Sequence, residues 1–153
     1  MKPHFIIKDA EVSDVLLIQQ MITELAEYEK LLPQMVATPE LLTKHLFGNN
    51  PIAHVLIAYD NHIPIGFALY FYNFSTFIGK PGIYLEDLYI KEAYRGNGYG
   101  KALLQKIIEK AREEDCGRVE WSVLDWNTPA IDFYIKVGAI PMNEWTTFRI
   151  ELI

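Results

Sequence analysis

The chain has little cysteine, no long hydrophobic run and no excess of basic charge. Its single cysteine, Cys116, excludes an internal disulfide and any metal site built from several cysteines. No apolar run is long enough to span a bilayer. The start Met1–His4 lacks a signal-peptide pattern, so we expect a cytoplasmic protein. A formal net charge of −6 disfavours a broad phosphate-coating surface, so nucleic acid is not an expected partner, and without a spanning run a membrane is not expected either.

The sequence also lacks repeats, low-complexity tracts and linkers. Its four histidines are scattered without metal-ligand spacing, so no metal site is expected. Half of the residues are hydrophobic and 22% are charged, which is typical of a globular protein. At 153 residues the chain fits one domain, and we expect a single domain over residues 1–153.

Strand and helix patterns alternate along the chain. Apolar residues recur at helical spacing in four stretches: Val15–Ala26, Pro39–Phe47, Lys101–Asp115 and Pro129–Val137. Six stretches read as strands: Phe5–Lys8, His54–Tyr59, Ile63–Tyr72, Gly82–Ile90, Val119–Leu124 and Trp145–Leu152. This order, β-α-α-β-β-β-α-β-α-β, predicts an α/β protein with a mixed sheet.

The stretch Arg95–Gly100, with the sequence RGNGYG, is the most informative of the chain. It lies between the strand pattern Gly82–Ile90 and the helical pattern that begins at Lys101. Glycine tolerates positive φ and has no Cβ, so this backbone can curl and bring its N–H groups close to a ligand. A curled loop that opens a helix also presents unpaired N–H groups and the positive end of the helix dipole. The pattern therefore predicts a site for a phosphate or pyrophosphate.

The spacing of this loop separates three kinds of phosphate site. A P-loop would need a glycine where Arg95 stands and a serine or threonine where Ala102 stands. A Rossmann fingerprint would need G-x-G-x-x-G, whereas the chain has G-x-G-x-G. The remaining pattern, Arg/Gln-x-x-Gly-x-Gly/Ala, resembles the pyrophosphate loop of acetyl-CoA-dependent N-acetyltransferases, and Arg95, Gly98 and Gly100 satisfy it.

A second segment, Asp125–Ala139, strengthens this resemblance. It has an asparagine at a strand end, followed by a helix with an aromatic pair that ends in glycine. Together the two segments resemble the GNAT (Gcn5-related) N-acetyltransferase superfamily. Further stretches are similar to its diamine acetyltransferase family, and to the thialysine acetyltransferase branch more than to the spermidine/spermine branch: Glu24–Glu29, Phe74–Phe77, Tyr84–Ile90 and Val123–Asn127.

The resemblance implies a fold, a cosubstrate and an assembly. The fold is a mixed, mainly antiparallel central sheet with helices on both faces and a splayed strand pair that binds acetyl-CoA. No metal is implied, and a homodimer is expected. The expected acetyl-CoA contacts are Leu88, Tyr89, Ile90, Arg95, Gly96, Asn97, Gly98, Tyr99, Gly100, Lys101, Asn127 and Tyr134.

The expected reaction is direct acetyl transfer to a primary amine, which needs a base and an acid. An alkylammonium has a pKa near 10.4, so a base is needed to free the nucleophile. Glu86 is the candidate base and Asp87 the candidate contact for the substrate ammonium. Strand alternation predicts that they point to opposite faces; alternatively, either pairs with a lysine or caps a loop. The resemblance implies that Tyr134 is the general acid; the alternative is an aromatic ring that only packs between helix and sheet. It also implies that Asn127 binds the pantetheine arm; the alternative is a residue that caps a helix.

Three further residues are candidate substrate contacts. Tyr28 and Glu29 follow the first helical stretch and match positions that receive the amine in relatives, although the charges of this segment are equally compatible with solvated helix ends. Ser75 stands where the polyamine branch has an acid, which favours a lysine-like amino acid over spermine. Two alternatives remain: acetylation of a peptide or protein amine, and an acetyl-CoA-binding module without catalysis. Retention of Glu86 and Tyr134 argues against the latter.

Overall fold

The computed structural model describes residues 4–153, so the expectation drawn from the first residues, Met1–Pro3, lies outside the described part. The chain divides into two compact units, one that ends at Ser122 and one that runs from Val123 to Ile153. Whether they form the single domain expected from the sequence stays a prediction.

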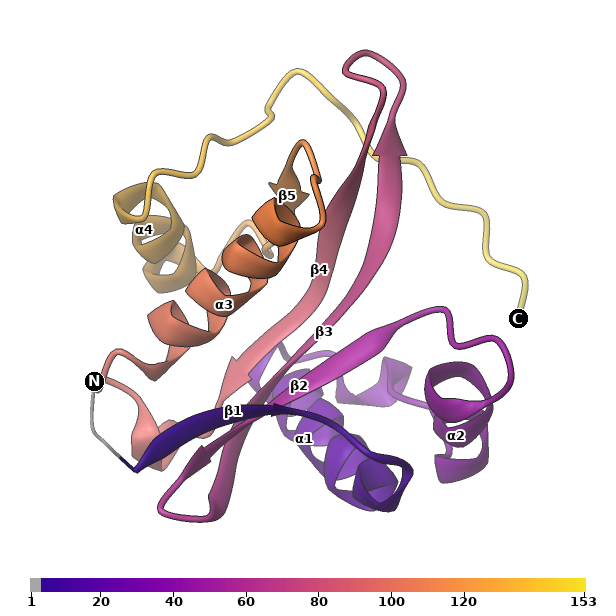
Figure 1. Cartoon of the computed structure of the whole chain (residues 1–153), viewed down its shortest axis with the longest axis vertical. Helices are drawn as coiled ribbons and strands as arrows, with labels where there is room; N and C mark the ends of the chain where they lie inside the picture. The colour runs from indigo at the N-terminus through magenta and orange to yellow at the C-terminus, as the bar shows by residue number, and fades with distance from the viewer. Residues whose placement is uncertain (1–3) are drawn as a thin grey trace. The chain divides into compact units, whose positions relative to one another are not determined.

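The first unit contains a five-stranded sheet with strand order β1-β2-β3-β4-β5 (Figure 1). The first three neighbouring pairs are antiparallel, and β4 pairs with β5 in parallel. The strands are β1 (Phe5–Asp9), β2 (His54–Asp60), β3 (Ile63–Ser75), β4 (Lys80–Ile90) and β5 (Val119–Glu120). The helices of this unit are α1 (Val15–Tyr28), α2 (Pro39–Phe47) and α3 (Tyr99–Glu113), with 3₁₀ turns at Val12–Asp14, Leu32–Gln34 and Glu92–Tyr94.

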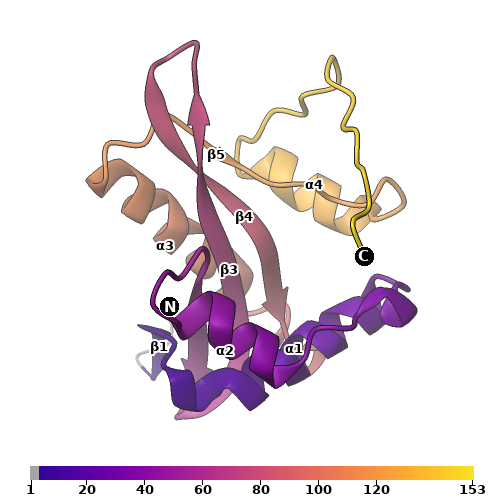
Figure 2. The ribbon, with the colours of Figure 1, turned by 90° about the vertical axis from the view of Figure 1, so that its right-hand side faces the viewer.

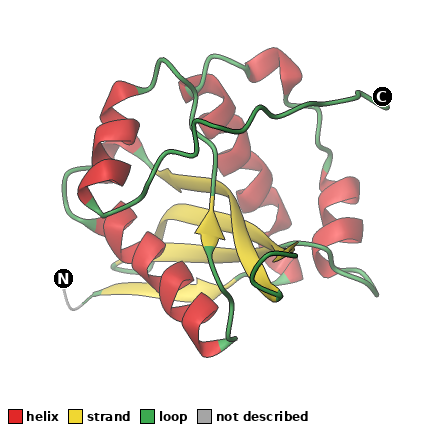
Figure 3. Cartoon of the chain, turned by 90° about the horizontal axis from the view of Figure 1, so that it is seen from above, coloured by secondary structure: helices red, strands yellow, loops and turns green. Residues whose placement is uncertain are grey.

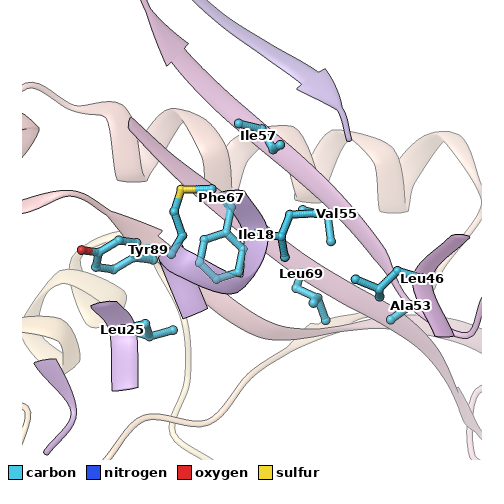
Figure 4. Packing of buried hydrophobic residues seen from close by; sticks show 10 residues of the cluster. Ile18, Leu25, Leu46, Ala53, Val55, Ile57, Phe67, Leu69 and Tyr89 are labelled. Carbon is cyan, nitrogen blue, oxygen red and sulfur yellow. The ribbon is translucent and has the colours of Figure 1, made fainter. Parts of the chain in front are cut away.

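Helices α1 and α2 cover one face of this sheet. Alternate residues of β2 and β3 point to this face, because successive strand side chains point to opposite sides. They form one apolar cluster with the helices, and Tyr89 of β4 lies at its margin (Figure 4). The buried members of this cluster are Ile18, Met21, Leu25, Leu46, Ala53, Val55, Ile57, Phe67, Leu69 and Tyr89. This packing fixes the C-terminal end of α1 against the end of β4.

Helix α3 lies on the opposite side of the sheet from α1 (Figures 2 and 3). Its apolar residues recur at helical spacing, and Leu103, Leu104 and Ile107 are buried. Because Phe67 and Leu69 face α1, the intervening Ala68 faces α3 and is buried as well. The mixed sheet with helices on both faces confirms the fold class predicted from the sequence.

Two strand predictions were wrong near the C-terminus. The predicted strand Val119–Leu124 is limited to Val119–Glu120, and Trp145–Leu152 forms no strand. The apolar residues that alternate in the latter segment are almost fully exposed: Phe148 is 91% exposed and Ile150 86%. Alternation alone does not make a strand, because the backbone also needs a partner strand. No other described strand pairs with this segment.

The second unit contains one helix, α4 (Thr128–Lys136), which has Pro129 in its first turn and is followed by Gly138 at φ 97°. Proline at the first turn and glycine after the end are the expected helix punctuation. Over residues 4–153, none of the helices combines the length and the apolar character that crossing a membrane requires.

Candidate active site

The glycine loop leads from the end of β4 into α3, as the sequence predicts. Gly96 and Gly98 have φ values of 80° and 79°, in the left-handed region that favours glycine. Asn97 fixes the curl: its Nδ2 donates to the carbonyl oxygens of Tyr94 at 3.0 Å and Arg95 at 3.3 Å. In α3 the N–H of Ala102 bonds the carbonyl of Gly98, so the N–H groups before it have no carbonyl of this helix to bind. The loop therefore has the local geometry of an anion site.

Two glycines of the loop make a matched pair of variants. An alanine at position 98 would have to adopt the left-handed φ of 79°, which is strained for a residue with a Cβ. Gly98→Ala should therefore lower the free energy of unfolding by about 1 kcal/mol. A Cβ at Gly100 meets only Ile90 Cγ1 at 3.7 Å, an ordinary contact, so Gly100→Ala, inside α3, should raise stability slightly and not lower it. Thermal unfolding measures both. Equal destabilisation by the two variants would contradict this account of the loop.

The side chains of the loop differ in what they offer a ligand. Tyr99 is buried, its ring is stacked on Phe5 at 4.5 Å, and its hydroxyl donates to Asp60 at 2.9 Å. Its contribution to an anion site is therefore limited to its backbone N–H. Lys101 is exposed beside the helix start, where its charge suits an anion.

The edge of β4, the strand that leads into the loop, is only partly paired with β5. The parallel ladder with β5 pairs Ile83 and Tyr84, whereas β4 continues to Ile90. This early end of the ladder agrees with the splayed strand pair expected from the sequence. The side chains of Tyr89 and Ile90 are buried, so at this edge the two residues offer a ligand their backbone N–H and C=O groups. With Leu88 they form the stretch where an extended ligand would add to the strand.

A β-bulge at Glu86 interrupts the regular strand that the sequence predicts. In the β3–β4 ladder, Leu69 pairs with Asp87 and Tyr70 with Leu85, which leaves Glu86 without an opposite residue. An extra residue of this kind breaks the regular alternation and re-aims side chains. Strict alternation therefore does not hold at Glu86, and the expectation that Glu86 and Asp87 point to opposite faces stays a prediction. Asp87 shares the face of Leu69, which is the face that α1 covers.

Charge interactions link three carboxylates at this bulge: Glu86, Asp87 and Glu29, which is the C-cap residue of α1. Burial, the charge of Glu86 and then the charge of Glu29 together raise the pKa of Asp87 from 3.8 to about 7. Burial and the charge of Glu86 also raise the pKa of Glu29. Glu86 itself is exposed. This carboxylate group is suited to attract a cation and to exchange a proton near neutral pH.

Ser75 lies apart from the carboxylate group. It is buried at the end of β3, pairs with Lys80, and its Oγ accepts the N–H of Ile78 at 3.4 Å. Lys80 and Glu86 are six residues apart on β4, which corresponds to about 20 Å of strand. Within one chain, Ser75 is thus too far away to touch a lysine-like amine held at Asp87, and the selectivity argument based on it gains no support.

Two predicted residues, Asn127 and Tyr134, belong to the second unit. Asn127 is buried and is the N-cap of α4: its Oδ1 accepts the N–H of Ala130 at 3.4 Å. The alternative reading as a helix cap is therefore correct, and a role toward acetyl-CoA would come in addition to it. Tyr134 lies in the middle of α4, with its ring 5.4 Å from that of Phe133.

Sequence reasoning missed the arrangement around Arg95: Tyr28 was expected to contact the amine, and Glu24 was given no role of its own. The Nε of Arg95 donates to the carbonyl of Ile90 at 2.8 Å, and its guanidinium lies over the ring of Tyr28. Glu24 joins this arrangement from α1 by accepting the hydroxyl of Tyr89 and pairing with Lys91. Glu24 and Tyr28 are four residues apart on one helix face, which is the signal in the sequence that could have linked them.

Comparisons with known proteins point to one family. A sequence model of the Acetyltransferase (GNAT) family matches residues 18–139. The chain is 40% identical over 157 residues to a thialysine N-epsilon-acetyltransferase of Sus scrofa, covering 95% of this chain and 92% of that protein. It is 30% identical over 189 residues to an L-ornithine N5-acetyltransferase of Arabidopsis thaliana, covering 94% and 83%.

A solved structure gives the same fold. An aminoglycoside acetyltransferase from an uncultured soil metagenomic sample matches with a TM-score of 0.81 at 19% identity, covering 98% of this chain and 97% of that one. At this identity the likeness shows the fold alone.

Proposed function

The chain belongs to the acetyltransferase (GNAT) family, and we propose that it transfers the acetyl group of acetyl-CoA to a primary amine of a small molecule. A lysine-like amino acid such as thialysine, or a diamine, is the acceptor class that we infer. The observation that carries this proposal is the carboxylate group of Glu29, Glu86 and Asp87 beside the strand that leads into the glycine loop. Asp87 thus lies about 10 Å before the end of β4, and the glycine loop with its anion site follows that end.

The carboxylate group would prepare the amine for attack. Asp87 attracts the substrate ammonium once it is ionised, and burial strengthens that attraction because the surroundings screen it less than water does. Glu86 is exposed, so a water molecule can carry the amine proton to it. The neutral amine then forms the new N–C bond.

Backbone and loop groups would serve acetyl-CoA. The glycine loop and the start of α3 receive the pyrophosphate, and the backbone of Leu88–Ile90 pairs with the pantetheine amides. A backbone N–H of this stretch polarises the thioester carbonyl, as in an oxyanion hole. As the C–S bond breaks, Tyr134 gives its phenolic proton to the thiolate. In this scheme Asn127 also binds the pantetheine arm.

The acceptor is tested with a panel of amines, by following free CoA released from acetyl-CoA. We expect turnover on thialysine or lysine, weaker turnover on putrescine, spermidine and spermine, and none on a lysine peptide. Preference for the polyamines would keep the enzyme class and overturn the lysine-like acceptor. Preference for the peptide would overturn the small-molecule assignment. Tight acetyl-CoA binding without turnover on any amine would favour a binding module.

We also propose that two copies associate in the cytoplasm. The almost fully exposed Phe148, Ile150 and Leu152 alternate along a segment with the pattern of a strand, and a second copy would cover them. The lone free cysteine, Cys116, is compatible with a reducing compartment.

A further inference from the structure

The side chain of Arg95 is held on three sides. Its Nε donates to the carbonyl of Ile90 at 2.8 Å. Its Cζ lies 4.8 Å from the ring centroid of Tyr28 and 5.7 Å from that of Tyr89. Both distances lie within the reach of a cation–π interaction, which extends to about 6 Å. The orientation of Arg95 thus depends on two aromatic rings.

Of these two rings, that of Tyr89 is held in place by burial and by a hydrogen bond. It is 7% exposed in the apolar cluster under α1, and its hydroxyl donates to Glu24 Oε1 at 2.9 Å. Lys91 Nζ lies 3.3 Å from the other oxygen of Glu24. The last two turns of α1 are therefore joined to the end of β4 by Glu24 and to the glycine loop by Tyr28.

We propose that Tyr28 is a positioning residue for acetyl-CoA: its ring fixes the guanidinium of Arg95 for the phosphates of the cosubstrate. This inference rests on the proposed function and changes the role expected for Tyr28 from the sequence, which was contact with the amine. A stacked guanidinium uses its flat face, so the N–H groups at its edge remain directed outward. These edge groups match the oxygens of a phosphate in a bidentate manner. Fixing them before binding reduces the entropy that binding costs.

The direct test is the dissociation constant of CoA, measured by calorimetry without any amine. Tyr28→Leu removes the ring, whereas Tyr28→Phe keeps it and removes only the hydroxyl. Because an exposed cation–π contact is modest, we expect Tyr28→Leu to weaken CoA binding about fivefold. Tyr28→Phe should stay within about twofold of the wild type, since phenylalanine also accepts a cation on its face. The KM for thialysine should change less than the CoA affinity in Tyr28→Leu.

A double-mutant cycle with Arg95→Lys shows whether Tyr28 acts through Arg95. Lysine keeps the positive charge and lacks the planar guanidinium. In the Arg95→Lys background, Tyr28→Leu should weaken CoA binding by less than about twofold, because the two residues act as a unit. Melting temperatures near that of the wild type confirm that the variants are folded, as expected for Tyr28, which is 37% exposed.

The outcomes separate this inference from the proposed function. Unchanged CoA binding in Tyr28→Leu, equal losses in Tyr28→Leu and Tyr28→Phe, or a full fivefold loss in the Arg95→Lys background would each overturn the positioning role. So would an effect confined to the KM of the amine. A wild-type chain that binds no CoA would overturn the proposed function and this inference together.

Discussion

Replacing Tyr134 by phenylalanine is expected to lower kcat at least about 100-fold and to leave the dissociation constant of acetyl-CoA unchanged. The ordinary pKa of a phenol, about 10, is close enough to that of a thiol, about 8.5, for a phenol to protonate a departing thiolate. Phenylalanine keeps the ring on α4 next to Phe133 and removes only the proton donor. The loss should therefore appear in turnover and not in binding. Steady-state kinetics with thialysine and calorimetry with CoA measure the two quantities.

The matched control is Tyr59→Phe, which removes the same hydroxyl from a partly buried tyrosine on β2, outside the proposed site. Its kcat should equal that of the wild type. If Tyr134→Phe keeps wild-type turnover, or loses acetyl-CoA affinity in proportion to kcat, Tyr134 is not the general acid.

Asp87→Asn is expected to produce the second large effect, and this effect should depend on pH. Since the pKa of Asp87 is raised to about 7, its carboxylate is mostly ionised at pH 8 and mostly protonated at pH 6. The variant should have a kcat/KM for the amine about 100-fold below the wild type at pH 8. This deficit should shrink about tenfold at pH 6, where the wild type itself holds the proton. A pH profile of kcat/KM from 5.5 to 9 measures this.

The neighbouring carboxylates provide the internal control. Glu86 raises the pKa of Asp87 more than Glu29 does. Glu86→Gln should therefore move the inflection of the profile to lower pH, and Glu29→Gln should move it in the same direction by less. An inflection near pH 7 that persists in Asp87→Asn would show that another group titrates there.

Asp87→Asn should also stabilise the fold at neutral pH. The ordinary pKa of this carboxyl is 3.8, so between pH 4 and 7 the folded chain binds a proton that the unfolded chain has lost. Stability contributed by Asp87 is therefore lost as pH rises from about 4 to about 7 and stays low above it. Asp87→Asn should be more stable than the wild type by about 2–4 kcal/mol at pH 8, and by little at pH 4. Equal pH dependence of the two melting temperatures would contradict the raised pKa.

Local features of the site were predictable from the sequence. The left-handed φ of Gly96 and Gly98 depends on the absence of a Cβ, which is a property of the residue itself. Helix α3 followed from its apolar spacing, and the cap at Asn127 was the alternative interpretation, which the preference of asparagine for that position favours. These predictions needed no knowledge of what lies across the sheet.

Features that depend on a distant partner were not predictable. The bulge at Glu86 is set by the pairing of β3 with β4, and the pairing register cannot be read from β4 alone. The contact between Tyr28 and Arg95 joins residues far apart in the sequence. The C-terminal segment has the alternation of a strand but no described partner, so the pattern predicted an element that is absent from the single chain.

The central claim is that this chain acetylates a small primary amine, and amine-dependent release of CoA tests it most directly. Wild type and Tyr134→Phe are incubated with acetyl-CoA, with and without thialysine. Free thiol is followed by absorbance, and acetylated thialysine is followed by mass spectrometry. The account predicts that the wild type forms equal amounts of thiol and acetylated amine, only when the amine is present, and at least about 100 times faster than the variant. Thiol release without amine, or at equal rates in the two chains, would contradict it.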